Sequence, residues 1–174
     1  MRTVKSLSLP MKGLRHAGMA TALVLGLCLG AQSQAQPAVP DYGPALTLDM
    51  ARKAMSAADA LARGNGWNVA IAILDSGGQM VMYQKFDNTH HASIAVAQGK
   101  ARTALDMRRP TRVLEEAVAS GGGALGLLSA RELTLLQGGV PIVSGGKIVG
   151  SIGVSGVASA NDEKVAFAGA EALK

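Results

Sequence analysis

The chain has 174 residues, 48% of them hydrophobic but only 3% aromatic, with 17 basic residues, 12 acidic residues and one cysteine. Four of the basic residues fall within the first 16, so the rest of the chain, with 13 basic against 12 acidic residues, is nearly neutral. A basic patch of the size that nucleic-acid binding requires is therefore not expected, which argues against a nucleic-acid partner.

The first 35 residues have the three parts of a secretory signal peptide. A basic start without acids leads into an apolar run of 14 residues, AGMATALVLGLCLG (residues 17–30), and small residues at Ser33 and Ala35 precede the expected cut. The run is too short to span a bilayer, which takes about 20 apolar residues. We therefore expect residues 1–35 to be removed near Ala35 and the mature protein to be periplasmic or extracellular.

Cleavage at this point would also remove Cys28, the only cysteine of the chain. A lipid anchor is not expected, because Leu27 stands where a lipid-anchored protein has a small residue before its cysteine. The mature protein would then lack disulfides, thiol catalysis and every metal site that needs cysteine. About 139 residues would remain, which is enough for one domain.

The domain is expected over residues 46–174, behind a proline-rich flexible tether at residues 36–45 (QPAVPDYGPA). Residues 44–63 carry the three- and four-residue apolar repeat of a helix. Thr47 is expected as its N-cap with Asp49 in the first turn, where an acid interacts favourably with the helix dipole. The glycines that follow the repeat predict its end.

The next segments predict a hairpin and a second helix. Residues 67–74 (WNVAIAIL) form a short apolar strand, residues 75–78 (DSGG) a turn and residues 79–85 (QMVMYQK) the returning strand. Residues 89–108 are rich in alanine and have an apolar stripe along one side, which predicts a helix. Pro110 ends it, because proline cannot continue a helical hydrogen-bond ladder.

The last third of the chain predicts a short helix, a second hairpin and a final helix. The short helix covers residues 111–119, and residues 125–136 fit an irregular segment that leads into a strand. Residues 140–144 and 147–154 form the second hairpin, with two glycines as its turn. The final helix covers residues 163–173 and is preceded by Asn161 and Asp162, with Asp162 and Glu163 expected to cap it.

Helices and strands are thus segregated along the chain, and both clear strand pairings are hairpins. This order indicates an α+β fold with an antiparallel sheet of about five strands flanked by helices, and not a doubly wound parallel sheet. A repeat of about 20–50 residues is absent from the sequence.

The glycine-rich stretch VPIVSGGKIVGSIGVSG (residues 140–156) raises the question of a nucleotide-binding loop. A P-loop needs GxxxxGK followed by Ser or Thr, but Lys147 is followed by Ile148, so this reading is rejected. Two of the glycines are instead expected to supply the positive φ of the hairpin turn. Gly150 and Gly153 are three apart and lie on opposite faces of their strand, where each lets a helix, a second subunit or a flat ligand approach closely.

This stretch also carries a resemblance to a known family. GGVPIVSGGKIVGSIGVSGVASANDEKVAFAG (residues 138–169), with KARTAL at residues 100–105, resembles the GlcG/HbpS-like family of small haem-binding proteins. It is similar too to the C-terminal domain fused to some cobalamin adenosyltransferases. The resemblance runs from about Leu46 to Lys174. It implies a central antiparallel sheet flanked by helices, a homo-oligomer, and haem binding, haem degradation or, in secreted members, sensing with a membrane kinase.

Five residues are candidates for a cofactor site. His90 and His91 are the only histidines after the signal peptide, and a neutral imidazole can ligate haem iron. Successive helical side chains point about 100° apart, so at most one of them faces a given pocket. Lys100 and Arg102 could pair with haem propionates, and Thr103 matches the position that the resemblance associates with haem contact. The competing interpretation is that the histidines are surface residues and Thr103 is packed inside the domain.

Three functions remain open at this point. The first is a secreted haem-binding protein for scavenging, transport or sensing, with a possible membrane sensor partner. The second is an enzyme that degrades haem or acts on another small cofactor, and the third is an oligomeric assembly protein without a small ligand. The sequence has no CxxCH motif, so haem would be held without covalent attachment. It offers no residue that we assign as catalytic.

Overall fold

The computed structural model describes residues 38–174, so the predicted signal peptide at residues 1–35 lies outside the described residues. The helices are α1 (Leu48–Gly64), α2 (His91–Asp106), α3 (Thr111–Ala119) and α4 (Ser159–Glu171), with a 3-10 helix η1 (Gly122–Ser129). The strands are β1 (Ala70–Asp75), β2 (Met80–Lys85), β3 (Gly139–Ser144) and β4 (Lys147–Ser155). Within this part of the chain, the helices all lack the combination of length and hydropathy that a membrane crossing requires.

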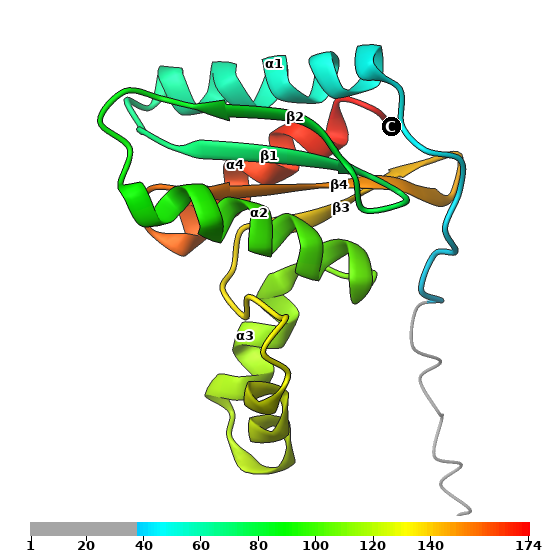
Figure 1. Ribbon diagram of the computed structural model, residues 1–174, viewed down its shortest axis with the longest axis vertical. Helices are drawn as coiled ribbons and strands as arrows, with labels where there is room; N and C mark the ends of the chain where they lie inside the picture. Colours follow the sequence, from blue (N-terminus) through cyan, green and yellow to red (C-terminus); the bar gives the residue numbers. More distant parts are fainter. Residues whose placement is uncertain (1–37) are drawn as a thin grey trace, which may run out of the picture. The chain divides into compact units, whose positions relative to one another are not determined.

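The four strands form one antiparallel sheet in the order β2-β1-β4-β3 (Figure 1). Both predicted hairpins are present, and β1 pairs with β4 to join them. The α+β class is therefore confirmed, with four strands where about five were expected. The difference arises after residue 121, because the segment expected to lead into a strand folds as η1 and an irregular return.

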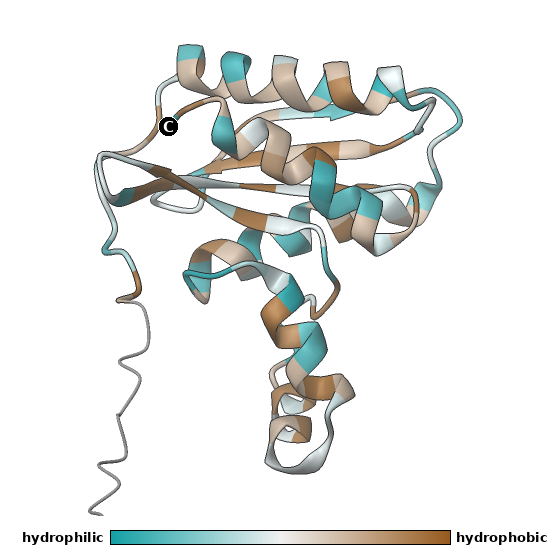
Figure 2. Cartoon of the chain, turned by 180° about the vertical axis from the view of Figure 1, so that it is seen from behind, coloured by the Kyte–Doolittle hydropathy of each residue, from teal (hydrophilic) through white to brown (hydrophobic). Residues whose placement is uncertain are grey.

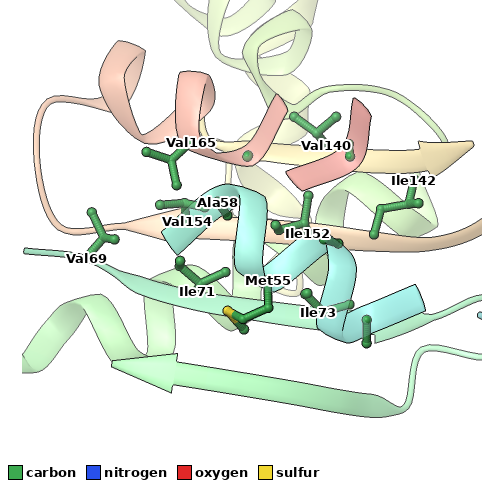
Figure 3. Packing of buried hydrophobic residues seen from close by; sticks show 14 of the residues in the cluster. Met55, Ala58, Val69, Ile71, Ile73, Val140, Ile142, Ile152, Val154 and Val165 are labelled. Carbon is green, nitrogen blue, oxygen red and sulfur yellow. The ribbon is translucent and has the colours of Figure 1, made fainter. Parts of the chain in front are cut away.

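The main core lies between the sheet and the pair of helices α1 and α4 (Figure 3). Met55 from α1 and Val165 from α4 are buried over Ile71 of β1 and Ile152 of β4. These side chains are at the helical and strand positions that the apolar repeats predict. Burying each of them contributes about 1.5–3 kcal/mol.

Helix α2 covers the opposite face, where most of the residues of β1 are alanines. Ala70, Ala72 and Leu74 of β1 form a second buried cluster with Ala97 and Ala101 of α2. Because β1 is buried on both faces, its sequence is an unbroken apolar run rather than an alternating one. Short side chains at this interface let the helix axis come close to the sheet.

Gly150 and Gly153 of β4 each lie where the backbone or a side chain of a neighbouring element comes too close for a Cβ atom. A Cβ added at Gly153 would meet the backbone of α2 at Ala97 and Ala101, while one added at Gly150 would meet Leu46 and the carbonyl of Leu74. The expectation that the two glycines lie on opposite faces is confirmed. Of the three neighbours considered from the sequence, the packed helix occupies the place beside Gly153.

The turn between β3 and β4 is the predicted two-residue turn. Ser144 pairs with Lys147, and the intervening Gly145 and Gly146 have φ values of 56° and 76°. Such positive values suit glycine and the type I′ geometry of a tight hairpin. The stretch that could have been a nucleotide cradle is thus a hairpin.

The chain before α1 is attached to the sheet. Ile148 N donates to Asp41 O at 2.8 Å, Gly43 N donates to Ile148 O at 2.8 Å and Leu46 N donates to Val149 O at 2.9 Å. The Tyr42 hydroxyl donates to the carbonyl of Leu105 at 2.9 Å. The predicted tether at residues 36–45 is therefore fixed from Asp41 onward, because β4 extends beyond the end of β1 and offers free backbone groups there.

The helix ends agree with the sequence in one case and differ in another. Thr47 caps α1 as expected, since its Oγ1 accepts a hydrogen bond from Met50 N at 3.3 Å. Helix α4 begins at Ser159 rather than at Glu163, because the amides of Asn161 and Asp162 already donate to Ala158 O. Asp162 thus lies in the first turn of α4, and its side chain is free for another role.

Candidate functional site

The two histidines lie side by side at the start of α2. His90 is the N-cap residue and His91 the first helical residue, and both side chains are exposed. The loop before them is fixed by Thr89, which is buried and donates from Oγ1 to Phe86 O at 2.8 Å. His90 makes no side-chain capping bond. Both imidazoles are therefore accessible to a ligand from solvent.

Lys100 lies in the interior, away from the histidines. It is 1% exposed, and its Nζ donates to Asp162 Oδ2 at 2.8 Å and to Val154 O at 2.9 Å. A charged lysine buried this deeply needs such partners, since removing an ammonium group from water without them is costly. The structure does not place this ammonium group where it could meet a haem propionate.

Asp162 is the acidic partner of this buried pair. Its Oδ1 accepts a hydrogen bond from Val157 N at 3.1 Å, which fixes the turn between β4 and α4. Burial raises the pKa of Asp162 above its ordinary value, and the hydrogen bond from Lys100 acts in the opposite direction. The pair links α2, the end of β4 and the first turn of α4. This is a structural role.

Arg102 and Thr103 lie farther along α2 and differ in exposure. Arg102 is on the surface and pairs with Asp106 at 2.8 Å. Thr103 is fully buried, and its Oγ1 accepts a hydrogen bond from Thr134 N at 2.8 Å. A ligand could reach Thr103 only if the segment around Thr134 moved. This placement agrees with the competing interpretation of Thr103 as a packed residue.

The helix itself separates the candidate residues into two groups. His91 and Thr103 are twelve residues apart, which corresponds to about 18 Å along the helix axis at 1.5 Å per residue. The histidines are at one end of α2, whereas Arg102 and Thr103 are near the other. The structure brings the two histidines together but does not bring them together with Lys100, Arg102 or Thr103.

A hollow of about 680 Å³ lies between α1, the open edge of the sheet at β2 and the loop that follows β2. Its volume is within the roughly 300–1,000 Å³ of small-molecule sites. The lining is mainly polar, with three cations, two carboxylates and three largely buried apolar side chains: Arg52, Arg63, Lys85, Asp59, Asp87, Met55, Met82 and Phe86. Such a lining suits a ligand that carries several polar or charged groups.

One wall of this hollow is an aromatic and charged cluster. The Arg63 guanidinium lies 4.6 Å from the ring centroid of Phe86 and pairs with Asp59 at 2.8 Å. The hydrogen bond from Arg63 holds the pKa of Asp59 below its usual value. Asp59 also accepts a hydrogen bond from Gln84 of β2. Helix α1 and the edge strand are thereby held together beside the hollow.

None of the five predicted site residues lines the hollow in the described part of the chain. Its lining reaches Asn88, which has a φ of 60° and stands two residues before His90. Among residues 38–174, a cluster of three or more His, Cys, Asp or Glu that could hold a metal ion is absent.

The sequence reasoning missed both the hollow and the buried ion pair. The hollow joins residues of α1 to residues of β2 that are about 25 positions apart, as the Asp59–Gln84 contact illustrates. The pair did leave a signal, because Lys100 is three residues after Ala97 and four before Ala104 on the apolar side of α2. A lysine on an apolar helix face predicts a buried partner.

Comparison with protein families places these features in context. A family model described as "Haem degrading protein HbpS-like" matches residues 46–171. The chain belongs to the HbpS-like family. The Escherichia coli K12 protein GlcG is 40% identical over 110 residues, which cover 63% of this chain and 81% of GlcG. An uncharacterised 15.0 kDa protein of Citrobacter freundii is 31% identical over 113 residues, covering 64% and 80% of the two chains.

Solved structures of HbpS-like proteins have the same fold. A double mutant of Streptomyces reticuli HbpS is 32% identical with a TM-score of 0.69, over 80% of this chain and 94% of that one. The PduOC protein in a complex with haem is 25% identical with a TM-score of 0.70, over 75% and 96% of the two chains. A Klebsiella pneumoniae protein, ORFY, is 22% identical with a TM-score of 0.71 and shows the fold alone. A haem-related function follows for the family.

Proposed function

We propose that this protein is an exported haem-binding protein that holds haem without covalent attachment and serves in its scavenging, transport or sensing. The observation that carries the proposal is the family match over residues 46–171. The haem complex of PduOC, which has the same fold, supports haem as the ligand. The predicted signal peptide at residues 1–35 supports export, and sensing would need a membrane partner.

The residues present fit haem. His90 and His91 offer exposed imidazoles, either of which could ligate iron in its neutral form. The hollow beside the same loop offers the half-buried Met82 to an apolar ring and the exposed Lys85 to a propionate. When bound, haem would supply an iron centre with an open or exchangeable position. The protein would supply an imidazole, the side chain of Met82 and the ammonium group of Lys85.

A hemin titration tests this proposal. The purified protein is expected to bind hemin saturably with a shifted Soret band, and His90→Ala or His91→Ala should weaken binding by at least about tenfold, or about 1.4 kcal/mol. Gln98→Ala, at an exposed position of the same helix, is the matched control and should bind like wild type. Thr103→Ala should change hemin affinity less than the histidine substitution that has the larger effect, because the Thr103 hydroxyl oxygen already accepts a hydrogen bond from Thr134 N.

An unchanged hemin spectrum on addition of protein would refute haem binding. The same complex also distinguishes binding from degradation, which the description of the family model favours as a second function. A degrading enzyme supplied with oxygen and a reductant should lose the Soret band and release iron. A binding protein should keep the band under the same conditions.

Export predicts a processed protein in the periplasm or the medium. We expect its N-terminus to be at or near Gln36, as determined by mass spectrometry of the fractionated cell. An unprocessed chain confined to the cytoplasmic fraction would contradict export but would leave haem binding untouched. We also propose that the protein is a homo-oligomer, which is the state that the family resemblance implies.

A further inference from the structure

The strongest feature outside the haem proposal is an arm that extends from the body of the domain (Figure 1). We define the arm as residues 111–136, which comprise α3, η1 and the returning segment. No residue of η1 is buried, and Leu125, Leu128 and Leu136 are 49%, 61% and 44% exposed. Figure 2 shows hydrophobic residues along the arm. Leucines this exposed on a folded element indicate a contact surface.

A hollow of about 540 Å³ lies on the arm between α3 and the returning segment. Its lining is mainly apolar and includes Val118, Leu127, Leu133 and Leu135. The arm therefore presents both protruding leucines and an apolar recess. A surface with both features can receive a copy of itself.

The glycines of η1 differ from those of the sheet. A Cβ added at Gly123 or Gly126 would meet nothing within 4 Å, whereas one added at Gly153 would meet α2. Neither Gly123 nor Gly126 has a positive φ, so the backbone does not require glycine at these positions. Contacts within the domain therefore do not account for them. A neighbour outside the domain that approaches this backbone closely would account for them.

The 3-10 repeat arranges these residues in rows, because side chains three apart are aligned. Gly123, Gly126 and Ser129 form a row of small residues, and Leu125 and Leu128 form the next row. The leucine row of one copy can then lie in the small-residue row of another. The two rows are adjacent on one element, which gives a self-complementary surface.

The charges on the rim fit the same partner. Glu115 and Arg131 both line the arm hollow and are opposite in sign. Arg131 makes no ion pair with any residue between 38 and 174, and Glu115 accepts one hydrogen bond, from Gln137 N at 2.7 Å. In a two-fold dimer each contact occurs twice, so Arg131 of each copy can meet Glu115 of the other. A lipid surface would offer the Glu115 carboxylate no cationic partner.

We propose that the arm is the surface through which two copies of this chain associate about a two-fold axis. The leucine row of each copy packs against the small-residue row of the other, and two Arg131–Glu115 pairs form at the rim. This inference rests on the proposed homo-oligomer and names its contact surface. Haem binding is independent of it.

Light scattering on the purified protein tests the surface. Wild type should be a dimer or a multiple of one, and Leu128→Asp should lower the mass or weaken association by at least about tenfold, or about 1.4 kcal/mol. Leu48→Asp is the matched control, because Leu48 is a 47% exposed leucine on α1, and it should keep the wild-type mass. Gly126→Met should also weaken association while leaving the thermal unfolding of the monomer unchanged, since its side chain enters open space.

Charge reversal gives a second readout at the rim. Arg131→Glu should weaken association, and adding Glu115→Arg should restore it in part. If wild type is an oligomer and neither Leu128→Asp nor Gly126→Met changes its mass, the arm is not the contact surface, although the homo-oligomer would stand. A wild-type protein that is monomeric at every concentration would overturn both. If the protein is a monomer that binds lipid vesicles, and Leu128→Asp abolishes this binding, the arm is a lipid-binding surface and the proposal is overturned.

Discussion

Replacing Lys100 by methionine is expected to lower the free energy of unfolding by about 3–5 kcal/mol, the usual cost of removing one partner of a buried ion pair. The side chains of Lys100 and Asp162 are each 2% exposed, and their Nζ–Oδ2 distance is 2.8 Å. Methionine fills similar space but leaves the Asp162 carboxylate and the carbonyl of Val154 without their donor. Denaturant unfolding followed by circular dichroism measures the effect.

The pH dependence of this variant has a defined sign. Burial already raises the pKa of Asp162, and the loss of the hydrogen bond from Lys100 should raise it further. A carboxyl with a raised folded-state pKa stabilises the fold below its unfolded value and loses that contribution as the pH rises through the folded value. The deficit of Lys100→Met relative to wild type should therefore be larger at pH 7 than near pH 4.

Two variants control for the methionine itself. Lys53→Met replaces an exposed lysine of α1 and should change the free energy of unfolding by less than about 0.5 kcal/mol. Lys100→Met combined with Asp162→Asn removes both charges and should be more stable than Lys100→Met alone, because no unpaired charge stays buried. The asparagine can still accept the hydrogen bond from Val157 N. Equal stability of the single and double variants at pH 7 would show that the buried charge is not the cause.

The second large effect is expected at Gly153. An alanine there should destabilise the domain by about 3 kcal/mol, at the upper end of overpacking costs, because the added methyl group would strike helix backbone rather than a movable side chain. The atoms it would meet include the carbonyl oxygen of Ala97 and the amide nitrogen of Ala101. Relief requires the whole of α2 to move away from β4, which would also disturb the hydrogen bond from Ser151 Oγ to Ala101 O at 2.8 Å.

Gly64→Ala is the matched control for this substitution. Gly64 ends α1, has no atom within 4 Å of an added Cβ and does not have a positive φ. Alanine should there be neutral or stabilise by up to about 1 kcal/mol, because it is the better helix former. Thermal unfolding of both variants gives the comparison. A Gly153→Ala protein that melts with wild type would show that the gap between α2 and β4 is wider than described.

The candidate site was only partly predictable. The histidine pair stays a prediction, which depends on the rarity of histidine in this chain and its specific chemistry; its exposure at the start of α2 agrees with the predicted helix. The sequence predicts Lys100 as a ligand residue, whereas the structure buries it against Asp162, because position along a helix does not reveal what the helix faces. Arg63, Phe86 and Lys85 were missed because they come together only when α1 packs beside β2.

The sequence by itself determined the elements whose signals are local. The cap at Thr47, the Gly145–Gly146 turn and both hairpins depend on residues within a few positions of one another, and each formed where it was predicted. Only the tertiary structure decided the order β2-β1-β4-β3, the helix that fills the space beside Gly153 and the burial of Lys100 against Asp162. These features join residues about 50 or more positions apart, or set which face of an element is covered, and local periodicity carries no information about such partners.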